Sequence, residues 1–405
     1  MIQNGHSPSN HFPKQSDGAK IGALVVGGDF HGLAIVRSLG RRGIPVCVVD
    51  NEHSIARFSR YTTHYIKVAG LRGEQETVDA VLGVAKRMNL RGWVLYATRD
   101  EHVAAFSRHR AALCEWFRVP TPDWEVVKWA WNKWNTYQLA KKIGLCIPKT
   151  FCPRNAKELE QAEVEFPVGI KPAVKEDFFY ATKAKAWRAN NRDELRTFFA
   201  RASEHSRGNE VLIQEIIPGD GHHQYSSCLF FKDGQAVASM EARRWRQHPP
   251  EFGRAATYVE SIDHPEVREL SVRFLREINY YGLAEVEYKQ DPRDGKFKLL
   301  DVNARTWGFH ALGEATGVDF SHLLFADQVG EPVQECHGKS GVGWMRMVTD
   351  FPYSVLGLLN GQLKWGSYTE SLSNLAIESV FSSEDLKPSV AEFAMLPYLI
   401  VKKGI

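Results

Sequence analysis

Several signals that assign a chain to a specialised class are missing from these 405 residues. No apolar run approaches the roughly 20 residues that span a bilayer, and residues 1–20 lack the apolar core of a signal peptide. The formal net charge is only +3, which disfavours nucleic acid or an anionic membrane as a partner. We therefore expect a soluble, cytoplasmic protein with an unstructured leader at residues 1–20 and neither nucleic-acid nor membrane partners.

Cysteine is also scarce. The six cysteines are scattered and form no C-x-x-C pair, and without a secretory signal we expect reduced thiols rather than a disulfide framework. No internal repeat is present. The hydrophobic content of 43% is ordinary for a globular protein, and the length suits two or three domains.

The first folded segment lacks the glycine spacing of a dinucleotide-binding turn. A buried-strand run at residues 22–26 leads through Gly27, Gly28 and Gly32 to a helical segment and a second strand that ends at Asp50. This is the pattern of a βαβ unit, but its glycines do not fit G-x-G-x-x-G. The spacing disfavours an NAD-dependent oxidoreductase and favours a sheet domain whose loops line a substrate site.

Two alternating strands within residues 284–303 are joined by an Asp-Gly turn and predict a β-hairpin. Side chains alternate across a strand, so Glu287 on one arm can share a face with Asp301 and Asn303 on the other. Three oxygen-bearing side chains, with Arg305 two positions on, suit Mg²⁺ held against a nucleotide phosphate. The alternative is a solvated amphipathic hairpin.

Two lysines and one strand upstream can serve the same nucleotide. Lys133 opens a helix, and Lys171 ends a strand just before a proline. Facing a polyphosphate they would neutralise its charge; otherwise they are ordinary surface lysines. The strand at residues 214–217 could read adenine through its backbone, with Asp220 near the ribose hydroxyls, or it is an ordinary strand and turn.

In this order the lysines, the strand with its following acid, and the hairpin resemble the ATP-grasp superfamily over residues 21 to about 335. Within it the chain is most similar to carboxylate–amine ligases of the D-aspartate ligase and carbamoyl-phosphate-synthase-like group. The resemblance implies an α/β (α+β) fold. A Rossmann-like pre-ATP-grasp domain at 21–120 would precede an ATP-grasp domain of two α+β subdomains at 121–335, with a lid at about 149–218. Residues 336–405 would form an extension that packs on this core.

The resemblance also assigns roles to single residues. For the nucleotide, it implies that Lys133 and Lys171 contact the ATP phosphates, that Gln214, Glu215 and Ile217 contact adenine, and that Asp220 contacts the ribose. For the metal, it implies that Glu287, Asp301 and Asn303 bind one or two Mg²⁺ (or Mn²⁺) ions. Arg305 would stabilise the transferring phosphoryl group.

The chain departs from the family pattern at three points. Asp301 stands where a glutamate is usual, and Asn132 stands where an acid usually precedes the first lysine. Residues 173–185 contain no glycine, whereas many members of the superfamily place a glycine-rich lid loop there. We expect a stiffer aromatic loop, anchored over the phosphates by Lys183, and closure of this lid is the weak point of nucleotide turnover.

A basic run at residues 243–253 follows a strand and contains a Pro-Pro turn. Such runs usually form a solvated face. In the family context, however, Arg246 is predicted to bind the γ-phosphate or a substrate carboxylate. Arg346 is a weaker carboxylate-binding candidate.

Together these residues predict an ATP- and Mg²⁺-dependent ligase that joins a small-molecule carboxylate, such as an amino acid, to an amine through an acyl phosphate. Two alternatives stay open: a bicarbonate-activating carboxylase or carbamoyl-phosphate-type enzyme, and a nucleotide-binding regulatory protein without turnover. Because this family often dimerises, a homodimer is a further expectation.

Overall fold

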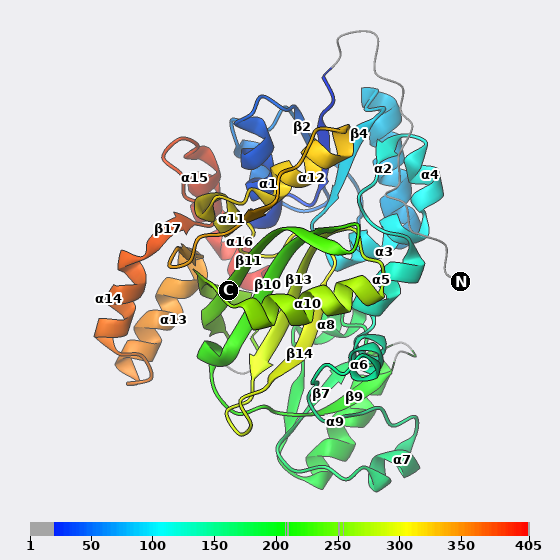
Figure 1. The fold of residues 1–405 in the computed structure, drawn as a ribbon, viewed down its shortest axis with the longest axis vertical. Helices are drawn as coiled ribbons and strands as arrows, with labels where there is room; N and C mark the ends of the chain where they lie inside the picture. The colour runs from blue at the N-terminus through cyan, green and yellow to red at the C-terminus, as the bar shows by residue number, and fades with distance from the viewer. Residues whose placement is uncertain (1–19, 207, 209, 250–251, 254, 404–405) are drawn as a thin grey trace.

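Three β-sheets organise the part of the chain that the computed structural model describes (Figure 1). The described residues are 20–206, 208, 210–249, 252–253 and 255–403. The predicted leader lies outside them except for Lys20. Within these ranges no helix has both the length and the apolar character of a membrane span.

The N-terminal unit is a five-stranded parallel sheet. Its elements are β1 (Ala23–Val26), α1 (Phe30–Gly40), β2 (Val46–Asp50), η1 (Ala56–Phe58), β3 (His64–Lys67), α2 (Glu74–Met88), β4 (Trp93–Ala97), α3 (Asp100–Arg108), α4 (Arg110–Cys114) and β5 (Phe117–Arg118). The strand order is β3-β2-β1-β4-β5. Strands β1 and β2 are continuous apolar runs because helices cover both faces of the sheet. The predicted βαβ unit is therefore confirmed.

A small antiparallel sheet lies at the opposite end of the molecule (Figure 1, bottom). The chain reaches and builds it through α5 (Trp124–Trp131), α6 (Lys133–Lys142), β6 (Thr150–Phe151), α7 (Ala156–Gln161), β7 (Val168–Pro172), α8 (Glu176–Thr182), β8 (Trp187–Ala189), α9 (Arg192–His205) and β9 (Val211–Glu215). Its strand order is β6-β9-β7-β8.

Helix α8 corrects the prediction of an aromatic loop at residues 173–185. The segment that lacks glycine contains a helix of two turns, with the acidic Glu176 and Asp177 in its first turn, where they complement the helix dipole. Lys183 ends this helix in the left-handed conformation, with φ of 58°. The same absence of glycine that favoured a stiff loop therefore permits a helix.

A large, mostly antiparallel sheet forms the centre of the molecule. Its elements and their neighbours are η2 (Gly221–His223), β10 (Gln224–Lys232), β11 (Gln235–His248), β12 (Ala255–Ile262), α10 (Pro265–Glu277), β13 (Gly282–Gln290), β14 (Phe297–Asn303), α11 (Ala311–Thr316), α12 (Phe320–Val329), β15 (Cys336–His337), β16 (Gly343–Met345) and β17 (Leu375–Glu378). The order is β14-β13-β10-β11-β12-β16-β17, with β15 beside β11. The predicted hairpin is confirmed as β13 and β14.

The basic run beginning at Arg243 was expected to follow a strand, and this expectation was wrong. Arg243 to His248 belong to β11 itself, where they pair with β12. A bulge between Arg244 and Arg246 interrupts the regular register.

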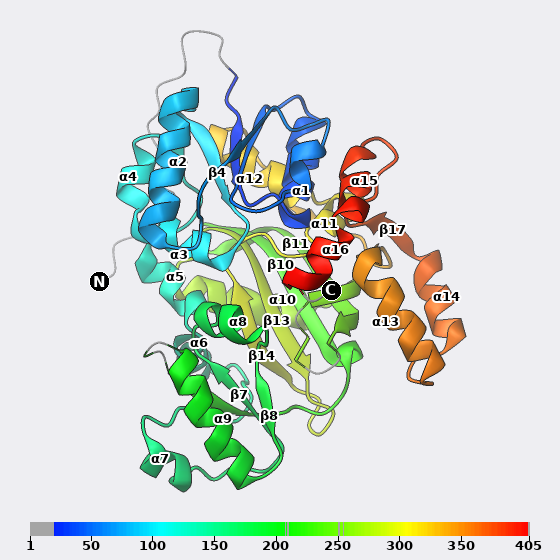
Figure 2. The same cartoon turned by 180° about the vertical axis from the view of Figure 1, so that it is seen from behind.

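The C-terminal extension continues the large sheet and adds four helices (Figure 2). They are α13 (Met347–Leu359), α14 (Trp365–Ser373), α15 (Lys387–Ala394) and α16 (Leu396–Lys403). Strands β16 and β17 join the edge of the sheet, so the extension is not a separate body. The predicted domain boundaries stay predictions.

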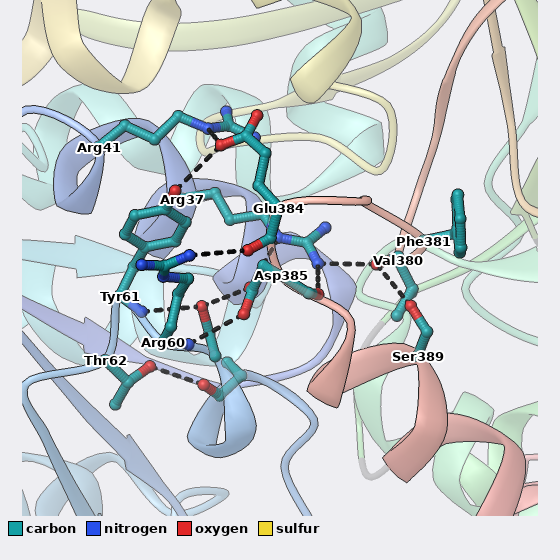
Figure 3. A network of polar contacts seen from close by, with 12 residues as sticks. Arg37, Arg41, Arg60, Tyr61, Thr62, Val380, Phe381, Glu384, Asp385 and Ser389 are labelled. Atoms are coloured by element: carbon teal, nitrogen blue, oxygen red, sulfur yellow. Dashed lines mark hydrogen bonds and ion pairs between the residues drawn. The ribbon is translucent and has the colours of Figure 1, made fainter.

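A buried polar network fastens the extension to the parallel sheet (Figure 3). Arg37 of α1 donates through Nε to Asp385 Oδ2 at 3.0 Å and through Nη2 to the Val380 carbonyl at 2.8 Å. The Asp385 carboxylate also accepts from Ser59 Oγ at 2.6 Å and from the Arg60 backbone N–H at 2.9 Å. Because this carboxylate has a partner for each oxygen, the segment that leads into α15 is held against the N-terminal unit.

Candidate functional site

A cavity of about 430 Å³ lies where the parallel sheet, α8, the large sheet and the C-terminal extension meet. The parallel sheet contributes the loops after β1, β2 and β4. The strand order reverses between β1 and β4. Open α/β sheets bind ligands at the carboxyl ends of strands beside such a reversal.

One wall of the cavity is the β13–β14 hairpin. Glu287 pairs across the strands with Asp301, and Glu285 pairs with Asn303. Asn303 Nδ2 donates to Glu285 Oε2 at 3.0 Å and to Glu287 Oε1 at 2.9 Å. All four side chains line the cavity, so the prediction that Glu287, Asp301 and Asn303 share a face is confirmed. Carboxylate and amide oxygens are the donors that Mg²⁺ prefers, and this wall fits such an ion by its donor set.

Cations keep the carboxylates of this wall ionised. Lys133 forms an ion pair with Asp301, and Arg244 Nη2 lies 3.1 Å from Glu287 Oε2. Burial opposes ionisation of Glu287, yet Arg244 and Lys185 lower the pKa of this carboxyl below its ordinary value. Burial also opposes ionisation of Asp301, and Lys133 lowers its pKa in turn. Glu287 and Asp301 are therefore ionised at neutral pH, and each is paired with a cation of the protein.

Two groups on the wall have pKa values near neutrality. Burial, and then the neighbouring charge of Glu287, raise the pKa of Glu285 to about 7. Burial lowers the pKa of Lys185 to about 8, although Glu287 opposes this shift. Lys185 Nζ donates to the Gly253 carbonyl at 3.0 Å. Its charge is thus available to an anionic ligand only below about pH 8.

Asp100, the first residue of α3, holds two cations of the cavity. Arg305 donates to it through Nε at 2.7 Å and through Nη2 at 3.0 Å, and Lys175 forms an ion pair with it. Burial opposes ionisation, but Arg305 and Lys175 lower the pKa of Asp100 well below its usual range. Arg305 Nη2 also contacts Asn303 Oδ1 at 3.3 Å. A residue of the parallel sheet's unit therefore orients an arginine of the large sheet and a lysine beside α8.

A second contact joins α8 to the same unit. Tyr180 Oη donates to Glu101 Oε1 at 2.6 Å, and the Arg72 guanidinium lies over the Tyr180 ring, 4.1 Å from its centroid. All three residues line the cavity. The aromatic segment noted in the sequence therefore covers one side of the cavity and is fastened at its tip.

The structure brings only part of the predicted set of site residues to the cavity. Lys183, Glu287, Asp301, Asn303 and Arg305 line it, and Lys133 contacts it through Asp301. Seven predicted residues are not among its lining residues: Lys133 itself, and Lys171, Gln214, Glu215, Ile217, Asp220 and Arg246.

The residues of β7, β9 and the turn after β9 that were predicted to bind nucleotide contact other protein groups. Lys171 Nζ donates to Tyr137 Oη at 2.7 Å, and Gln214 Nε2 donates to Thr150 Oγ1 at 2.8 Å. Glu215 accepts from Lys298 Nζ at 2.9 Å. Likewise, the Ile217 carbonyl accepts from Lys289, and Asp220 accepts from the backbone of His222. Their roles toward ATP stay predictions.

Arg246 has a buried partner elsewhere. It donates to Asp350 through Nε at 2.8 Å and through Nη2 at 2.9 Å. Arg244, two positions earlier, lines the cavity. Residues two apart on a regular strand share a face, but the bulge at this point separates them. The role predicted for Arg246 at the γ-phosphate or a substrate carboxylate stays a prediction, and Arg244 is the arginine of this run that lines the cavity.

Several charged residues line the cavity that sequence reasoning did not predict as site residues: Asp100, Lys175, Lys185, Arg244 and Glu285. Two of them had a usable signal. Glu285 lies two residues before Glu287 on one strand, so alternation places both on one face. Asp100 follows β4 at the reversal of strand order, where ligand-binding side chains concentrate. Lys175 and Lys185 had no such signal because they flank a helix that was not foreseen.

Comparisons with known proteins identify relatives of this chain. Residues 133–335 match the family model described as "Carbamoyl-phosphate synthase L chain, ATP binding domain". D-aspartate ligase of Enterococcus faecium is 24% identical over 321 residues, which cover 76% of each chain. The carbamoyl phosphate synthase large chain of Archaeoglobus fulgidus is 22% identical, and the match covers 80% of this chain and 31% of that one.

Solved structures share the fold at low identity. L-amino acid ligase from Bacillus licheniformis has a TM-score of 0.59 at 16% identity, covering 77% of this chain and 74% of its own. N5-carboxyaminoimidazole synthetase from Staphylococcus aureus, complexed with ADP, has a TM-score of 0.62 at 13% identity, covering 85% and 87% of the two chains.

Proposed function

The chain belongs to the family of the carbamoyl-phosphate synthase L chain ATP-binding domain, and from this premise we propose that it is an ATP- and Mg²⁺-dependent ligase that joins a carboxylate to an amine. The substrate carboxylate and amine are small molecules, and the carboxylate belongs to an amino acid or a similar small acid. Similarity to D-aspartate ligase over most of both chains supports this choice over bicarbonate activation.

One observation carries the proposal. Glu287, Asp301 and Asn303 present a set of oxygen donors to a cavity that also receives the cations Lys185 and Arg305. A polyphosphate needs both partners: a divalent cation held by oxygens, and fixed positive charge for the remaining phosphate oxygens. The hairpin and the groups facing it offer both within one cavity.

Mg²⁺ bound by these three residues would neutralise charge between the β- and γ-phosphates of ATP. An oxygen of the substrate carboxylate attacks the γ-phosphorus, the bond to the β-phosphate oxygen breaks, and ADP leaves an acyl phosphate behind. The amine nitrogen then attacks the acyl carbon, phosphate departs, and the amide remains after loss of a proton. Arg305, Arg244 and Lys185 stabilise the negative charge that moves during these steps.

Asp100 has a positioning role in this scheme. It grips the Arg305 guanidinium through two hydrogen bonds and pairs with Lys175. A guanidinium held at two points keeps its orientation while charge develops on the phosphoryl group, so little reorganisation is needed during the reaction. The parallel sheet's unit would thus supply a positioning residue for the arginine proposed to face the phosphoryl group.

Release of ADP tests the proposed function. The chain would be incubated with ATP, Mg²⁺ and pairs drawn from a panel of amino acids, small carboxylates and amines, with EDTA and omission of each substrate as controls. We expect ADP, phosphate and a new amide in equal amounts with at least one pair. Tight ATP binding without ADP release for every pair would instead support a nucleotide-binding protein without turnover.

A further inference from the structure

Exposed apolar side chains are concentrated in one part of this molecule. Among the described residues, every large hydrophobic side chain classed as exposed lies between residues 347 and 400, in the C-terminal extension. Seven of them belong to α13 and α14, which together with their turn form the α13–α14 hairpin at residues 347–373. They are Met347, Phe351, Val355, Leu356, Leu359, Trp365 and Leu372.

The α13–α14 hairpin projects from the edge of the molecule. Both views show the two helices side by side, away from the bulk of the three sheets (Figures 1 and 2). A helix on the surface of a monomer normally turns its apolar stripe toward the core. On α13 the polar side chains face the body of the molecule and the apolar side chains face solvent.

Polar groups fasten the inner face of the hairpin. Asp350 of α13 is buried and accepts two hydrogen bonds from Arg246, and Ser354 donates to the same carboxylate at 3.2 Å. Arg246 Nη1 also donates to Ser371 Oγ of α14 at 2.9 Å. One arginine of β11 therefore holds both helices, and Tyr353 of α13 also stacks on His248 of β11, with ring centroids 3.4 Å apart.

The outer face of α13 is apolar along its whole length. Met347, Phe351, Val355 and Leu359 follow one another at intervals of four residues, and all are exposed. Residues four apart lie on one side of a helix, so these side chains form a continuous stripe. Trp365 extends the apolar surface at the start of α14.

The area of this exposed surface is close to that of one side of a protein–protein interface. The seven side chains are between 37% and 78% exposed. Side chains of this kind present on the order of 200 Å² each when fully accessible, so the hairpin leaves roughly 750 Å² of mostly apolar surface in solvent. A stable protein interface of standard size buries about 800 Å² on each partner.

The charge of the hairpin argues against a membrane surface or a strongly charged partner. Its ionisable carboxylates and amines are Asp350, which is paired with Arg246, and one residue of each sign, Lys364 and Glu370. Peripheral membrane helices combine an apolar face with a basic one, and this hairpin has no basic face. A neutral, apolar helix pair is instead complementary to another copy of itself.

We propose that the α13–α14 hairpin is a homodimer interface, in which the hairpins of two copies pack across a two-fold axis as a four-helix bundle. Each copy then supplies two helices, and the stripe of α13 lies in the bundle core, where antiparallel helix pairs bury such stripes. The interface begins one residue after Arg346, which lines the cavity, so the dimer would also fix that wall. This inference does not depend on the proposed function.

Sedimentation of the full chain at micromolar concentrations tests the interface. We expect wild type to have the mass of a dimer and the double variant Phe351→Glu/Leu359→Glu to have that of a monomer, with a rise in dimer Kd of about 100-fold or more. Trp365→Ala on α14 should weaken the dimer in the same direction. Phe393→Glu on α15 is the matched control: it charges a side chain that is also exposed but lies outside the hairpin, and it should remain a dimer.

Circular dichroism of all variants should match wild type, because the substituted side chains are exposed. The Tm of the monomeric double variant should be lower than that of the wild-type dimer and independent of protein concentration. A wild-type chain that stays monomeric at concentrations about 100-fold above the Kd of a typical interface would overturn the proposal. A double variant that remains dimeric would also overturn it. Co-sedimentation of the monomeric wild type with anionic phospholipid vesicles, lost in the double variant, would overturn it in favour of a lipid surface.

Discussion

The two sides of the cavity were built in different ways. The β13–β14 wall brings Glu285, Glu287, Asp301 and Asn303 together by cross-strand pairing within one hairpin. The facing side joins Asp100 of the parallel sheet's unit to Lys175 beside α8 and to Arg305 after β14. On the first side sequence neighbours supply the chemistry, and on the second side three distant segments do.

The two sides of the cavity also differ in the charge that they present. The hairpin collects negative charge, and buried cations such as Arg244 keep it ionised. The facing side presents positive charge, and the single carboxylate of Asp100 holds it in place. We therefore expect substitutions in the hairpin to remove the metal-binding group itself, and substitutions on the facing side to disturb orientation.

The largest effect should come from Glu287→Gln. The amide keeps the shape of the side chain but loses the charge that a divalent cation requires, so Mg²⁺-dependent turnover should fall by about 10²- to 10³-fold or more. ADP release at saturating ATP and Mg²⁺ measures it. Glu277→Gln on α10, an exposed carboxylate outside the cavity, is the control. Wild-type rates in Glu287→Gln would remove this residue from the metal site.

Asp100→Asn should have the next largest effect. The amide leaves Arg305 and Lys175 without their shared negative partner, so we expect kcat to fall by about 10- to 100-fold, as when an orienting partner is removed. Because ATP binds through other groups as well, its KM should change much less.

A merely structural role for Asp100 would give a different pattern. Loss of folding would lower the active fraction without changing the KM or the pH profile of the remainder. Asp100→Glu keeps the charge and should recover part of kcat. Equal losses in Asp100→Asn and Asp100→Glu, accompanied by a lower Tm in both, would contradict a positioning role.

The pH dependence should distinguish Lys185 from Lys183. Burial lowers the pKa of Lys185 to about 8, so the cation is present below that pH and is lost above it. We expect kcat/KM for ATP to fall about tenfold for each unit above pH 8, and the comparison uses this limb because Glu285, with a pKa of about 7, titrates below it. Lys185→Arg keeps its charge and should flatten the profile.

The same profile measured on Lys183→Arg gives the comparison. Lys183 was the residue predicted to anchor the lid, and it also lines the cavity. A profile unchanged from wild type in Lys183→Arg, together with a flattened one in Lys185→Arg, assigns the titration to Lys185. The opposite result would return the phosphate contact to Lys183.

The smallest effect should come from Tyr180→Phe. This change removes the hydrogen bond to Glu101 and leaves the ring beneath Arg72, at a cost of about 1 kcal/mol or roughly fivefold in kcat/KM. Tyr180→Ala removes both contacts and should cost more. If both variants behave as wild type in ADP release, the contact at the tip of α8 does not hold the cavity closed.

The part of the site that could be predicted consists of residues that lie close together both in space and along one β-hairpin. Glu287 and Asp301 could be placed on one face because strand alternation and a short turn leave few registers. By contrast, sequence periodicity could not show that Arg244 rather than Arg246 lines the cavity, because a bulge between them changes which side chain faces it. A bulge of this kind leaves no periodic signal in the sequence.

Residues 173–185, in the predicted lid, are a second place where local sequence did not determine the structure. The absence of glycine in residues 173–185 predicted a stiff loop, but this composition is equally compatible with the helix that the structure shows. Contacts of Tyr180 with Glu101 and Arg72 help to hold α8 in place, and they join segments more than 70 residues apart. Propensity alone is a weak guide where tertiary contacts of this kind decide.

The sequence by itself determined the βαβ unit, the hairpin and the shared face of its three oxygen donors, because alternation and turn residues act over a few positions. Only the tertiary structure decided that Asp100 would grip Arg305, that Arg244 would face the cavity in place of Arg246, and that α13 would turn its apolar stripe outward. Each of these depends on how separate elements pack, and the burial and charge that stabilise them are properties of the assembled chain rather than of any local segment.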